Sequence, residues 1–347
     1  MAVTVTHVVN GPANPNASAD CSDVLRWLTC LYIHDDTRVV SGQQGGSGGS
    51  YPDGYEIYVE GLYDETGKYP GLLGGDFGLH DWSDAGWNST LIDFWDNGGL
   101  ISMSWHAYNP WTGNGLTWTG GDESDRDMNG GDFSDLYTPG NDAYTMWHAD
   151  MDKKAEWLSD LQDEGVVVLW RPFHEMNGGW FWWGDRDLTK FKKNWIHMFD
   201  YFTYEKGLNN LLWVYAPNRK PTAQDPAYYY PGDGYVDIVG LDYYITRWET
   251  LADIDDRGGP EMLALGKPFA LTEYGPTGFL NQCGPTDEHE PPVDCYEFDT
   301  LMDDIRDHCS QTIYFLAWWM NYAIINQLNA QELMDDSWTI TRDEVDW

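Results

Sequence analysis

Two glutamates lie at or soon after the ends of apolar runs, and together they could act on one bond. Glu175 comes after the run Val166–Leu169, and Glu273 ends the run Phe269–Thr272. Glycoside hydrolysis uses such a pair: one carboxylic acid protonates the departing sugar oxygen, and the other carboxylate lies across the bond. Aromatic side chains, which pack against the C–H faces of sugars, fill positions Trp180–Trp183 soon after Glu175. The sequence therefore predicts a site that cleaves sugars.

The surroundings of the two glutamates predict different charge states. Aromatic packing by Trp180 and Phe181 removes water from Glu175, which raises its pKa and suits it to donate a proton. Arg171 nearby would keep Glu273 ionised. Taken alone, Glu273 also fits a structural carboxylate that pairs with Arg171, and Glu175 also fits a strand-end residue beside core aromatics. The presence of both glutamates in matching positions favours the catalytic interpretation.

The elements that position these residues recur along the chain. Eight short apolar runs, rich in β-branched and aromatic residues, alternate with stretches able to form helices, as expected of parallel strands buried on both faces. Helices are predicted for Ala149–Glu164 and Leu188–Lys206, and Gly165 and Gly207 are placed to end them. The predicted strands are Arg38–Ser41, Gly71–Asp76, Leu100–His106, Val166–Glu175, Leu211–Pro217, Val236–Tyr244, Phe269–Tyr274 and Ile313–Trp319.

This alternation predicts an α/β fold, a (β/α)8 TIM barrel that forms a single catalytic domain over residues 1–347. An open doubly wound sheet is the alternative, but the glycine run Gly45–Gly49 lacks the spacing of a phosphate-binding turn. In the barrel, Glu175 closes the fourth strand and Glu273 the seventh. Because the carboxyl ends of barrel strands meet at one mouth, the two side chains are expected to face each other there.

The residues around Glu175 resemble a known family. The segment Arg171–Gly184 reads R-P-F-H-E-M-N-G-G-W-F-W-W-G and is similar to glycoside hydrolase family 26, the β-mannanase family. Most related barrel glycosidases carry Asn before the fourth-strand Glu, whereas this chain carries His174. The resemblance extends from about Ser41 to Asp336. It includes Gly75-Asp76, Ser104-Trp105-His106, Asn109-Pro110, Gly240-Leu241-Asp242-Tyr243-Tyr244 and Phe315-Leu316-Ala317-Trp318-Trp319.

The resemblance implies a role for each matching residue. Glu175 corresponds to the general acid/base and Glu273 to the nucleophile of a retaining mechanism, with carboxyl groups about 5–5.5 Å apart. Six further residues are implied to contact the bound sugar or the two glutamates. They are Arg171, His174, Trp180, His106, Tyr244 and Trp318.

Several of these assignments leave alternatives open. Tyr243 and Trp319 are next to Tyr244 and Trp318, and either neighbour fits the family pattern. His106 also fits a buried, hydrogen-bonded core histidine. Two further strand-end residues fit a structural or a functional role equally well, namely Asp76 and Gln43. The tryptophans expected in the cleft are Trp180, Trp182, Trp183 and Trp318.

The implied activity is that of a retaining endo-β-1,4-mannanase acting on mannan, glucomannan and galactomannan and their manno-oligosaccharides. Alternatives within the family are a mixed-linkage β-1,3-1,4-glucanase, a β-1,3-xylanase and an exo-enzyme that releases mannobiose. The long loop after the third strand, with Trp111 and Trp118, fits either an extended cleft or a cleft blocked at one end. A carbohydrate-binding barrel without catalysis is a remote alternative, because it requires one glutamate to be missing.

The charge of the chain excludes some partners. Its 57 Asp and Glu against 19 Lys and Arg give a net charge of −38. A surface this negative repels phosphate backbones and anionic lipids, so neither nucleic acid nor a membrane is an expected partner. A neutral polysaccharide is neither attracted nor repelled by this negative charge. The acidic residues are therefore expected to keep the surface hydrated. This is typical either of an ordinary acidic secreted protein or of a protein adapted to high salt. The chain is expected to act as a monomer.

The cysteines favour an extracellular protein. Cys21 with Cys30 and Cys283 with Cys295 are predicted as two local disulfides, which leaves Cys309 as a buried thiol. The first residues lack the pattern of a signal peptide, so secretion is inferred from the cysteines and the composition and not from a targeting segment.

No cofactor and no metal are expected. The histidines His197, His289 and His308 are scattered without ligand spacing. The acidic loop Asp122–Asp135 lacks the residue order of a calcium-binding loop, so a solvated loop is favoured.

Overall fold

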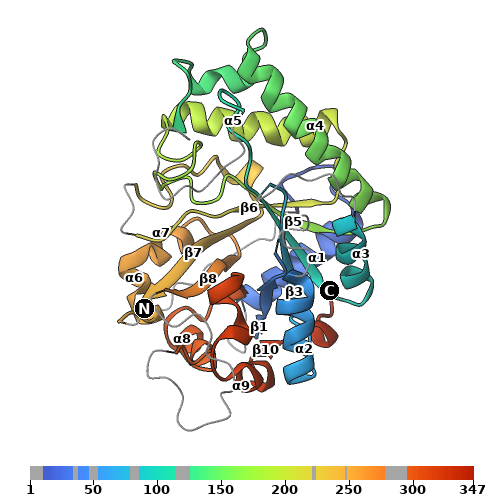
Figure 1. The fold of residues 1–347 in the computed structure, drawn as a ribbon, viewed down its shortest axis with the longest axis vertical. Helices are drawn as coiled ribbons and strands as arrows, with labels where there is room; N and C mark the ends of the chain where they lie inside the picture. Colours follow the sequence, from blue (N-terminus) through green and yellow to red (C-terminus); the bar gives the residue numbers. More distant parts are fainter. Residues whose placement is uncertain are drawn as a thin grey trace.

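The fold is a parallel barrel in a computed structural model that describes residues 11–33, 38–46, 54–78, 86–113, 126–220, 224–246, 248–277 and 295–347 (Figure 1). Strands β2 to β9 pair in chain order, and β9 also pairs with β2, which closes a barrel of eight parallel strands. The strands are β1 (Val39–Val40), β2 (Gly42–Gln44), β3 (Leu72–Asp76), β4 (Leu100–Trp105), β5 (Val168–Pro172), β6 (Leu211–Tyr215), β7 (Ile238–Thr246), β8 (Phe269–Thr277), β9 (Thr312–Ala317) and β10 (Thr339–Ile340).

Helices surround the barrel, and α4 and α5 lie side by side at the top of Figure 1. None of the helices in the described part of the chain is both long and apolar enough to span a membrane. The α-helices are α1 (Ala19–Ile33), α2 (Gly61–Thr66), α3 (Gly86–Asp96), α4 (Asp142–Asp163), α5 (Leu188–Asp200), α6 (Ile254–Arg257), α7 (Gly259–Leu263), α8 (Thr300–His308) and α9 (Ala330–Asp335). Single π-helical turns at Tyr55–Glu60 and Tyr201–Glu205 adjoin α2 and α5.

The predicted barrel is confirmed, with corrections at element ends. The first barrel strand is longer than the predicted Arg38–Ser41, because β1 continues past Ser41 into β2. Helix α4 begins seven residues before the predicted start, since the Asn141 side chain accepts the Tyr144 N–H at 2.8 Å and caps the helix there. Gly165 and Gly207, at φ +76° and +69°, follow α4 and the turn after α5 as predicted.

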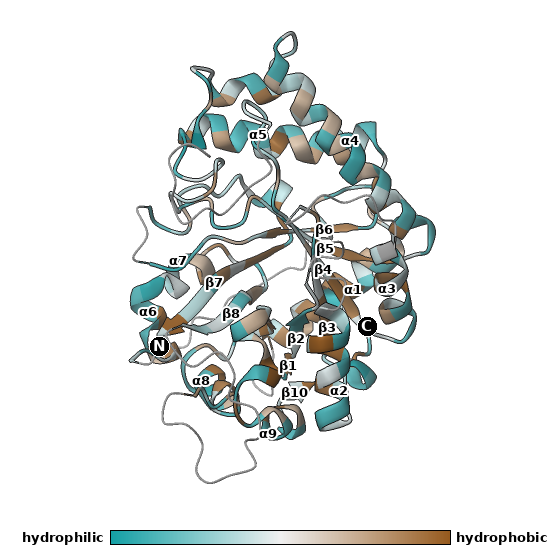
Figure 2. Cartoon of the chain, in the orientation of Figure 1, coloured by the Kyte–Doolittle hydropathy of each residue, from teal (hydrophilic) through white to brown (hydrophobic). Residues whose placement is uncertain are grey.

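The apolar character of the strands is explained by burial on both faces. Figure 2 shows hydrophobic residues along the strands and hydrophilic ones on the outer sides of the helices. Between the two layers, Trp147 of α4 stacks on Trp105 of β4 with ring centroids 4.9 Å apart. Burial of this kind contributes roughly 25 cal/mol per Å² of apolar surface, so the aromatic layer stabilises the barrel substantially.

A bulge between β7 and β8 sets the direction of two acidic side chains. Leu241 pairs with Leu271, but the next residue of β7, Asp242, pairs with Glu273, so Thr272 is the extra residue. A bulge turns the following side chains relative to the regular alternation. It brings Asp242 and Glu273 to the same level of the barrel.

The cysteine prediction is wrong for the first pair. Cys21 and Cys30 both lie in α1 and are free thiols, one buried and one exposed, because nine residues of helix separate them by about 13 Å. Cys309 is a free buried thiol, as predicted. Cys283 lies outside the described residues, and its disulfide with Cys295 stays a prediction.

Candidate active site

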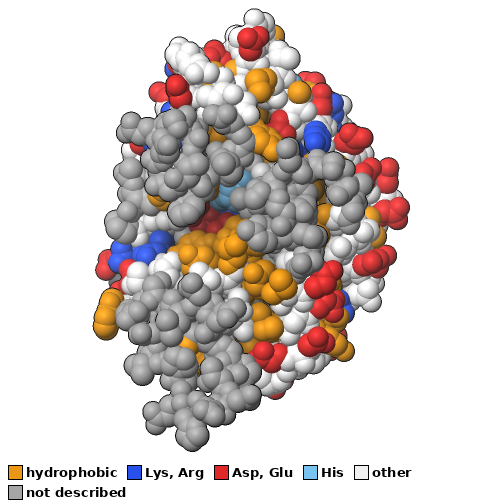
Figure 3. Space-filling model, viewed as in Figure 1, with side chains coloured by type: hydrophobic (Ala, Val, Ile, Leu, Met, Phe, Trp, Pro, Cys, Tyr) orange, Lys and Arg blue, Asp and Glu red, His pale blue; other side chains and the backbone are white. Residues whose placement is uncertain are grey.

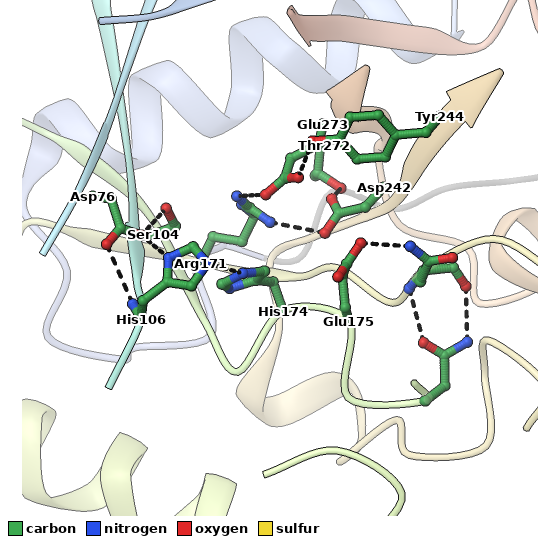
Figure 4. Close-up of polar contacts among 12 residues, drawn as sticks. Asp76, Ser104, His106, Arg171, His174, Glu175, Asp242, Tyr244, Thr272 and Glu273 are labelled. Carbon is green, nitrogen blue, oxygen red and sulfur yellow. Dashed lines mark hydrogen bonds and ion pairs between the residues drawn. The ribbon is translucent and has the colours of Figure 1, made fainter. Parts of the chain in front are cut away.

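Acidic and histidine side chains gather in a hollow of the molecule. Figure 3 shows this hollow near the middle of one face, with acidic and histidine side chains at its bottom and apolar side chains along one side. The polar groups of the site come from the carboxyl ends of barrel strands, which is where TIM barrels bind their substrates. Figure 4 shows how these side chains converge.

Glu175 lies on a tight turn just past the end of β5. The strand ends at Pro172 and not at Glu175 as predicted, because Phe173 and Glu175 have φ of +52° and +54°. Such backbone is uncommon for residues with a side chain and is held here by neighbours. The Glu175 N–H donates to the Ala216 carbonyl at 2.7 Å, which ties the turn to the end of β6.

Two donors hold the Glu175 carboxylate. The indole N–H of Trp180 donates to Oε2 at 2.5 Å, and the Asn218 amide donates to Oε1 at 2.5 Å. Trp180 reaches the carboxylate because its ring folds back over Gly178, where a Cβ would come within 2.3 Å of the ring. Asn177 in turn exchanges two hydrogen bonds with the backbone of Asn218, each 2.8 Å long. Glu175 is thus buried, oriented and bonded through both oxygens.

Glu273 is held by a tyrosine and an arginine (Figure 4). The Tyr244 hydroxyl donates to Oε2 at 2.6 Å, and the Arg171 guanidinium donates to Oε1 at 2.5 Å. The other arm of Arg171 donates to Asp242 at 3.0 Å, and Asp242 also accepts the Thr272 hydroxyl at 2.8 Å. Tyr244 and not Tyr243 is therefore the tyrosine that contacts the second glutamate.

A chain of polar groups occupies the other side of the site. The Asp76 carboxylate lies 2.6 Å from Nδ1 of His106, and Nε2 of His106 lies 3.1 Å from Nε2 of His174. Ser104 donates to the same Asp76 oxygen. If Asp76 accepts from His106, then His106 accepts from His174, so the chain fixes the tautomer of both rings. His106 is thus a buried, hydrogen-bonded histidine. It also contacts His174, the neighbour of Glu175 in the sequence.

Three carboxylates stand close together. Glu175, Asp242 and Glu273 each place an oxygen such that the three oxygens lie within 4.8 Å of one another. Among the described residues this is the one acidic or histidine cluster with the spacing of a metal site. The Arg171 guanidinium already bonds two of the three carboxylates and supplies the positive charge there, so the cluster does not favour a metal ion.

The charged and hydrogen-bonding neighbours of the two buried glutamates differ, and so does their electrostatic state. Loss of solvent, followed by the charge of Glu273, raises the pKa of Glu175 to about 7, although Asn218, Trp180 and Arg171 oppose the shift. Near neutral pH Glu175 therefore holds a proton in a substantial fraction of molecules. Glu273, with an arginine and a tyrosine as donors, is placed as an anion.

The aromatic residues divide differently from the prediction. Trp180 and Trp318 are half-buried, and the Trp318 ring lies 6.4 Å from His106, whereas Trp319 is buried against Gly46. The expectation that Trp182 and Trp183 lie in the cleft is wrong. Both are fully buried, and their indole N–H groups donate to the carbonyls of Ala107 and His174 at 2.8 Å, so they brace the turn.

The remaining candidates are structural in the described residues. The Gln43 amide is buried, donates to the carbonyls of the last residues of β2 and β9, and accepts the Ile324 N–H at 3.0 Å. Trp111 packs on Phe133 and Trp182 and donates to Asp135 at 3.2 Å. Asp132 and Asp135 cap a short 3-10 helix (Phe133–Tyr137), while Asp122–Asp125, Trp118 and His289 lie outside the described residues.

Two residues of the site were missed from the sequence. Asp242 lies in the segment Gly240–Tyr244, where the sequence assigned it no role, and it proves to share Arg171 with Glu273. Asn218 lies just beyond the apolar run Leu211–Pro217, and it proves to bond Glu175. The strand-end argument that identified the glutamates applies equally to Asn218, so a signal for it was present.

Comparison with known proteins gives consistent matches. Residues 13–344 match the family model of glycosyl hydrolase family 26. A mannan endo-1,4-beta-mannosidase A and B of Caldalkalibacillus mannanilyticus is 34% identical over 99% of this chain, and the chain spans 65% of that protein. A mannan endo-1,4-beta-mannosidase of Bacillus subtilis is 33% identical over 96% of the chain and 89% of its own length.

Solved structures agree. The structure of a Bacillus subtilis mannanase superposes with a TM-score of 0.80 at 30% identity, covering 97% of this chain and 96% of that one. A β-mannanase from a symbiotic protist of the termite Reticulitermes speratus, complexed with gluco-manno-oligosaccharide, superposes with a TM-score of 0.75 at 25% identity, covering 97% of both chains.

Proposed function

Since the chain belongs to glycosyl hydrolase family 26, we propose that it is a retaining endo-β-1,4-mannanase that cleaves mannan, glucomannan and galactomannan. The observation that carries the mechanism is the separation of the carboxylates. Oxygens of Glu175 and Glu273 lie within 4.8 Å of each other, too close to leave room for the water of an inverting enzyme. The two groups then act in double displacement.

In the first step, Glu273 attacks the anomeric carbon and Glu175 gives its proton to the departing sugar oxygen. The charge on Glu273 is supported by Arg171, whose guanidinium is fixed by Asp242 at 3.0 Å. Trp180 bonds Glu175 and offers its half-exposed ring to the departing chain. A covalent glycosyl-enzyme and a free sugar end result.

In the second step, Glu175, now an anion, takes a proton from water that attacks the anomeric carbon. The bond to Glu273 breaks, and the product keeps its original configuration. Tyr244 remains bonded to the Glu273 carboxylate throughout, so the leaving carboxylate is stabilised where it forms. His106, His174 and Trp318 line the same site and are assigned to the sugar held at the cleavage position.

The proposal is tested by a substrate panel. Release of reducing ends should be fastest on glucomannan and galactomannan, and slower by about tenfold or more on mixed-linkage β-glucan and β-1,3-xylan. Viscosity should fall early in the digestion if cutting is internal. Activity confined to β-glucan or β-1,3-xylan would reassign the substrate, mannobiose as the sole early product would indicate an exo mode, and no activity would favour a binding barrel.

The pH profile provides a separate prediction. Because Glu175 must be protonated to act as the acid, kcat/KM should fall on the alkaline side with a midpoint near pH 7. The hydrogen bond from Asn218 favours the charged form of Glu175, so Asn218→Ala should move this midpoint to higher pH. A profile of kcat/KM on a soluble mannan measures both; an alkaline midpoint that Asn218→Ala leaves unmoved would contradict the assignment.

We also propose that the enzyme works outside the cell as a monomer. Polymeric mannan does not cross membranes, and a chain with net charge −38 stays dispersed through self-repulsion. Mannanase activity in culture medium compared with washed cells tests the location, and light scattering tests the mass. The charge is assigned to hydration of the surface. Activity that is identical from low to molar salt would leave adaptation to high salt without support.

A further inference from the structure

The loop after β6 joins two parts of the active site. Its residue Asn218 bonds Glu175 through the side chain at 2.5 Å, and its backbone forms a bridge with Asp242 of β7. In that bridge the Asp242 N–H donates to the Pro217 carbonyl at 2.9 Å, and the Arg219 N–H donates to the Asp242 carbonyl at 3.2 Å. Asn218 therefore connects Glu175 to strand β7.

Strand β7 leads on to the nucleophile. Asp242 and Glu273 share the guanidinium of Arg171, which donates to Asp242 at 3.0 Å and to Glu273 at 2.5 Å. Asp242 also lies opposite Glu273 in the pairing of β7 with β8. The attachment of the Glu175 turn to Asn218 therefore helps to set the distance from Glu175 to Glu273. A retaining mechanism depends on that distance.

The side chain of Asn177 makes this attachment. Its amide N–H donates to the Asn218 carbonyl, and its amide oxygen accepts the Asn218 N–H, each at 2.8 Å. The amide also donates to the Gln224 carbonyl at 3.4 Å. Asn177 lies two residues after Glu175 and is fully buried. One side chain thus pairs both backbone groups of Asn218, as a neighbouring strand would, which an apolar side chain cannot do.

The backbone contact of the Glu175 turn does not replace Asn177. That contact, from the Glu175 N–H to the Ala216 carbonyl at 2.7 Å, holds Glu175 itself to the end of β6. Asn177 instead holds Asn218, whose amide reaches Oε1 of Glu175. Without Asn177 the N–H and carbonyl of Asn218 would lose their partner. Because unpaired polar groups away from water cost free energy, the loop is then expected to shift until they find other partners.

On the basis of the proposed function, we propose that Asn177 is a positioning residue of the reaction. Its side chain fastens the turn of the acid/base to the loop that carries Asn218. In this way it sets the separation of Glu175 from Glu273 and the hydrogen bond that Glu175 accepts from Asn218. Since Asn177 is fully buried, it acts through Asn218 and not through a contact with sugar.

The test compares the pH profiles of Asn177→Ala, Asn218→Ala and the double variant on a soluble mannan. Both single variants should move the alkaline midpoint of kcat/KM to higher pH, because both weaken the hydrogen bond that favours the charged form of Glu175. If Asn177 acts through Asn218, the double variant should have the midpoint of Asn218→Ala and shift no further. For Asn177→Ala we also expect kcat to fall about tenfold and KM to change by less than about twofold.

Asn210→Ala is the matched control. Asn210 is also buried, and its amide donates to the carbonyls of Leu158 and Val166 at 3.2 and 3.1 Å. It precedes β6 and so lies at the end of the barrel opposite the active site. Its loss should lower the thermal midpoint but leave kcat and the alkaline midpoint unchanged. Asn177→Ser keeps a hydroxyl that can form one of the two bonds, and it should give a smaller shift than Asn177→Ala.

The other outcomes overturn the inference. An alkaline midpoint that Asn177→Ala leaves unmoved or lowers would remove the positioning role, and so would a double variant in which the two shifts add. If neither Asn177→Ala nor Asn177→Ser folded, Asn177 would be a structural residue only. A wild-type chain inactive on every mannan would overturn the proposed function and this inference with it, whereas an active wild-type chain with an unmoved midpoint in Asn177→Ala would overturn this inference alone.

Discussion

Glu273→Ala is expected to abolish turnover of mannan while leaving the protein folded and able to bind sugar. Glu273 is the group placed to form the covalent bond, and in its absence the neighbouring Asp242 stays bonded to Arg171 and Thr272. Loss of the nucleophile should lower kcat by at least about 10⁵-fold, or about 7 kcal/mol of transition-state stabilisation.

The decisive measurement is chemical rescue of Glu273→Ala. Removal of the side chain leaves space below the anomeric carbon, and azide can attack there when the leaving group is a good one such as dinitrophenol. Attack from the nucleophile's side inverts a β-mannosyl donor, so the product should be the α-mannosyl azide. Glu65→Ala on the outer helix α2 is the control for a lost glutamate and should behave as wild type. Parental rates on mannan for Glu273→Ala would make the nucleophile assignment wrong.

The position of the glutamates was predictable because it depends on features that a sequence displays. An apolar run that ends in a polar residue marks the end of a buried parallel strand, and parallel strands of a closed barrel end at one mouth. Glu175 and Glu273 follow from this argument without knowledge of any contact. The same argument extends to Asn218, which follows its own apolar run.

The positions of the tryptophans that follow Glu175 could not be predicted, because they depend on the backbone angles of single residues. The left-handed residues Phe173 and Glu175 turn the chain so that Trp180 folds back onto Glu175, while Trp182 and Trp183 turn into the core. Three tryptophans within four positions look alike in a sequence, and the turn alone separates the one that meets the sugar from the two that brace it.

The bulge in β8 is a second such feature. Thr272 is an ordinary strand residue by type, yet as the extra residue it sets Asp242 opposite Glu273. In this register Arg171 bridges the two carboxylates. A one-residue difference in pairing has no signature in the residue types, so the link between Asp242 and Glu273 needed the structure.

Glu175→Ala is expected to separate the two steps of the reaction. Protonation of the leaving oxygen matters most when the leaving group is a sugar, so kcat/KM on mannan should fall about 10²–10⁴-fold. For dinitrophenyl β-mannobioside, whose leaving group needs no proton, the first step should slow by less than about tenfold. The second step still lacks its base, so a burst of dinitrophenol followed by a slow steady state is expected.

Azide provides the matching test, because it needs no base to attack the covalent intermediate. With Glu175→Ala it should accelerate the steady state and approach from the face opposite Glu273, which gives the β-mannosyl azide. The α-azide from Glu273→Ala and the β-azide from Glu175→Ala would assign the two carboxylates to opposite faces of one sugar, as double displacement requires. Equal losses of Glu175→Ala on mannan and on the aryl glycoside, with no response to azide, would remove the acid role from Glu175 and leave it a residue that only holds the site together through Trp180 and Asn218.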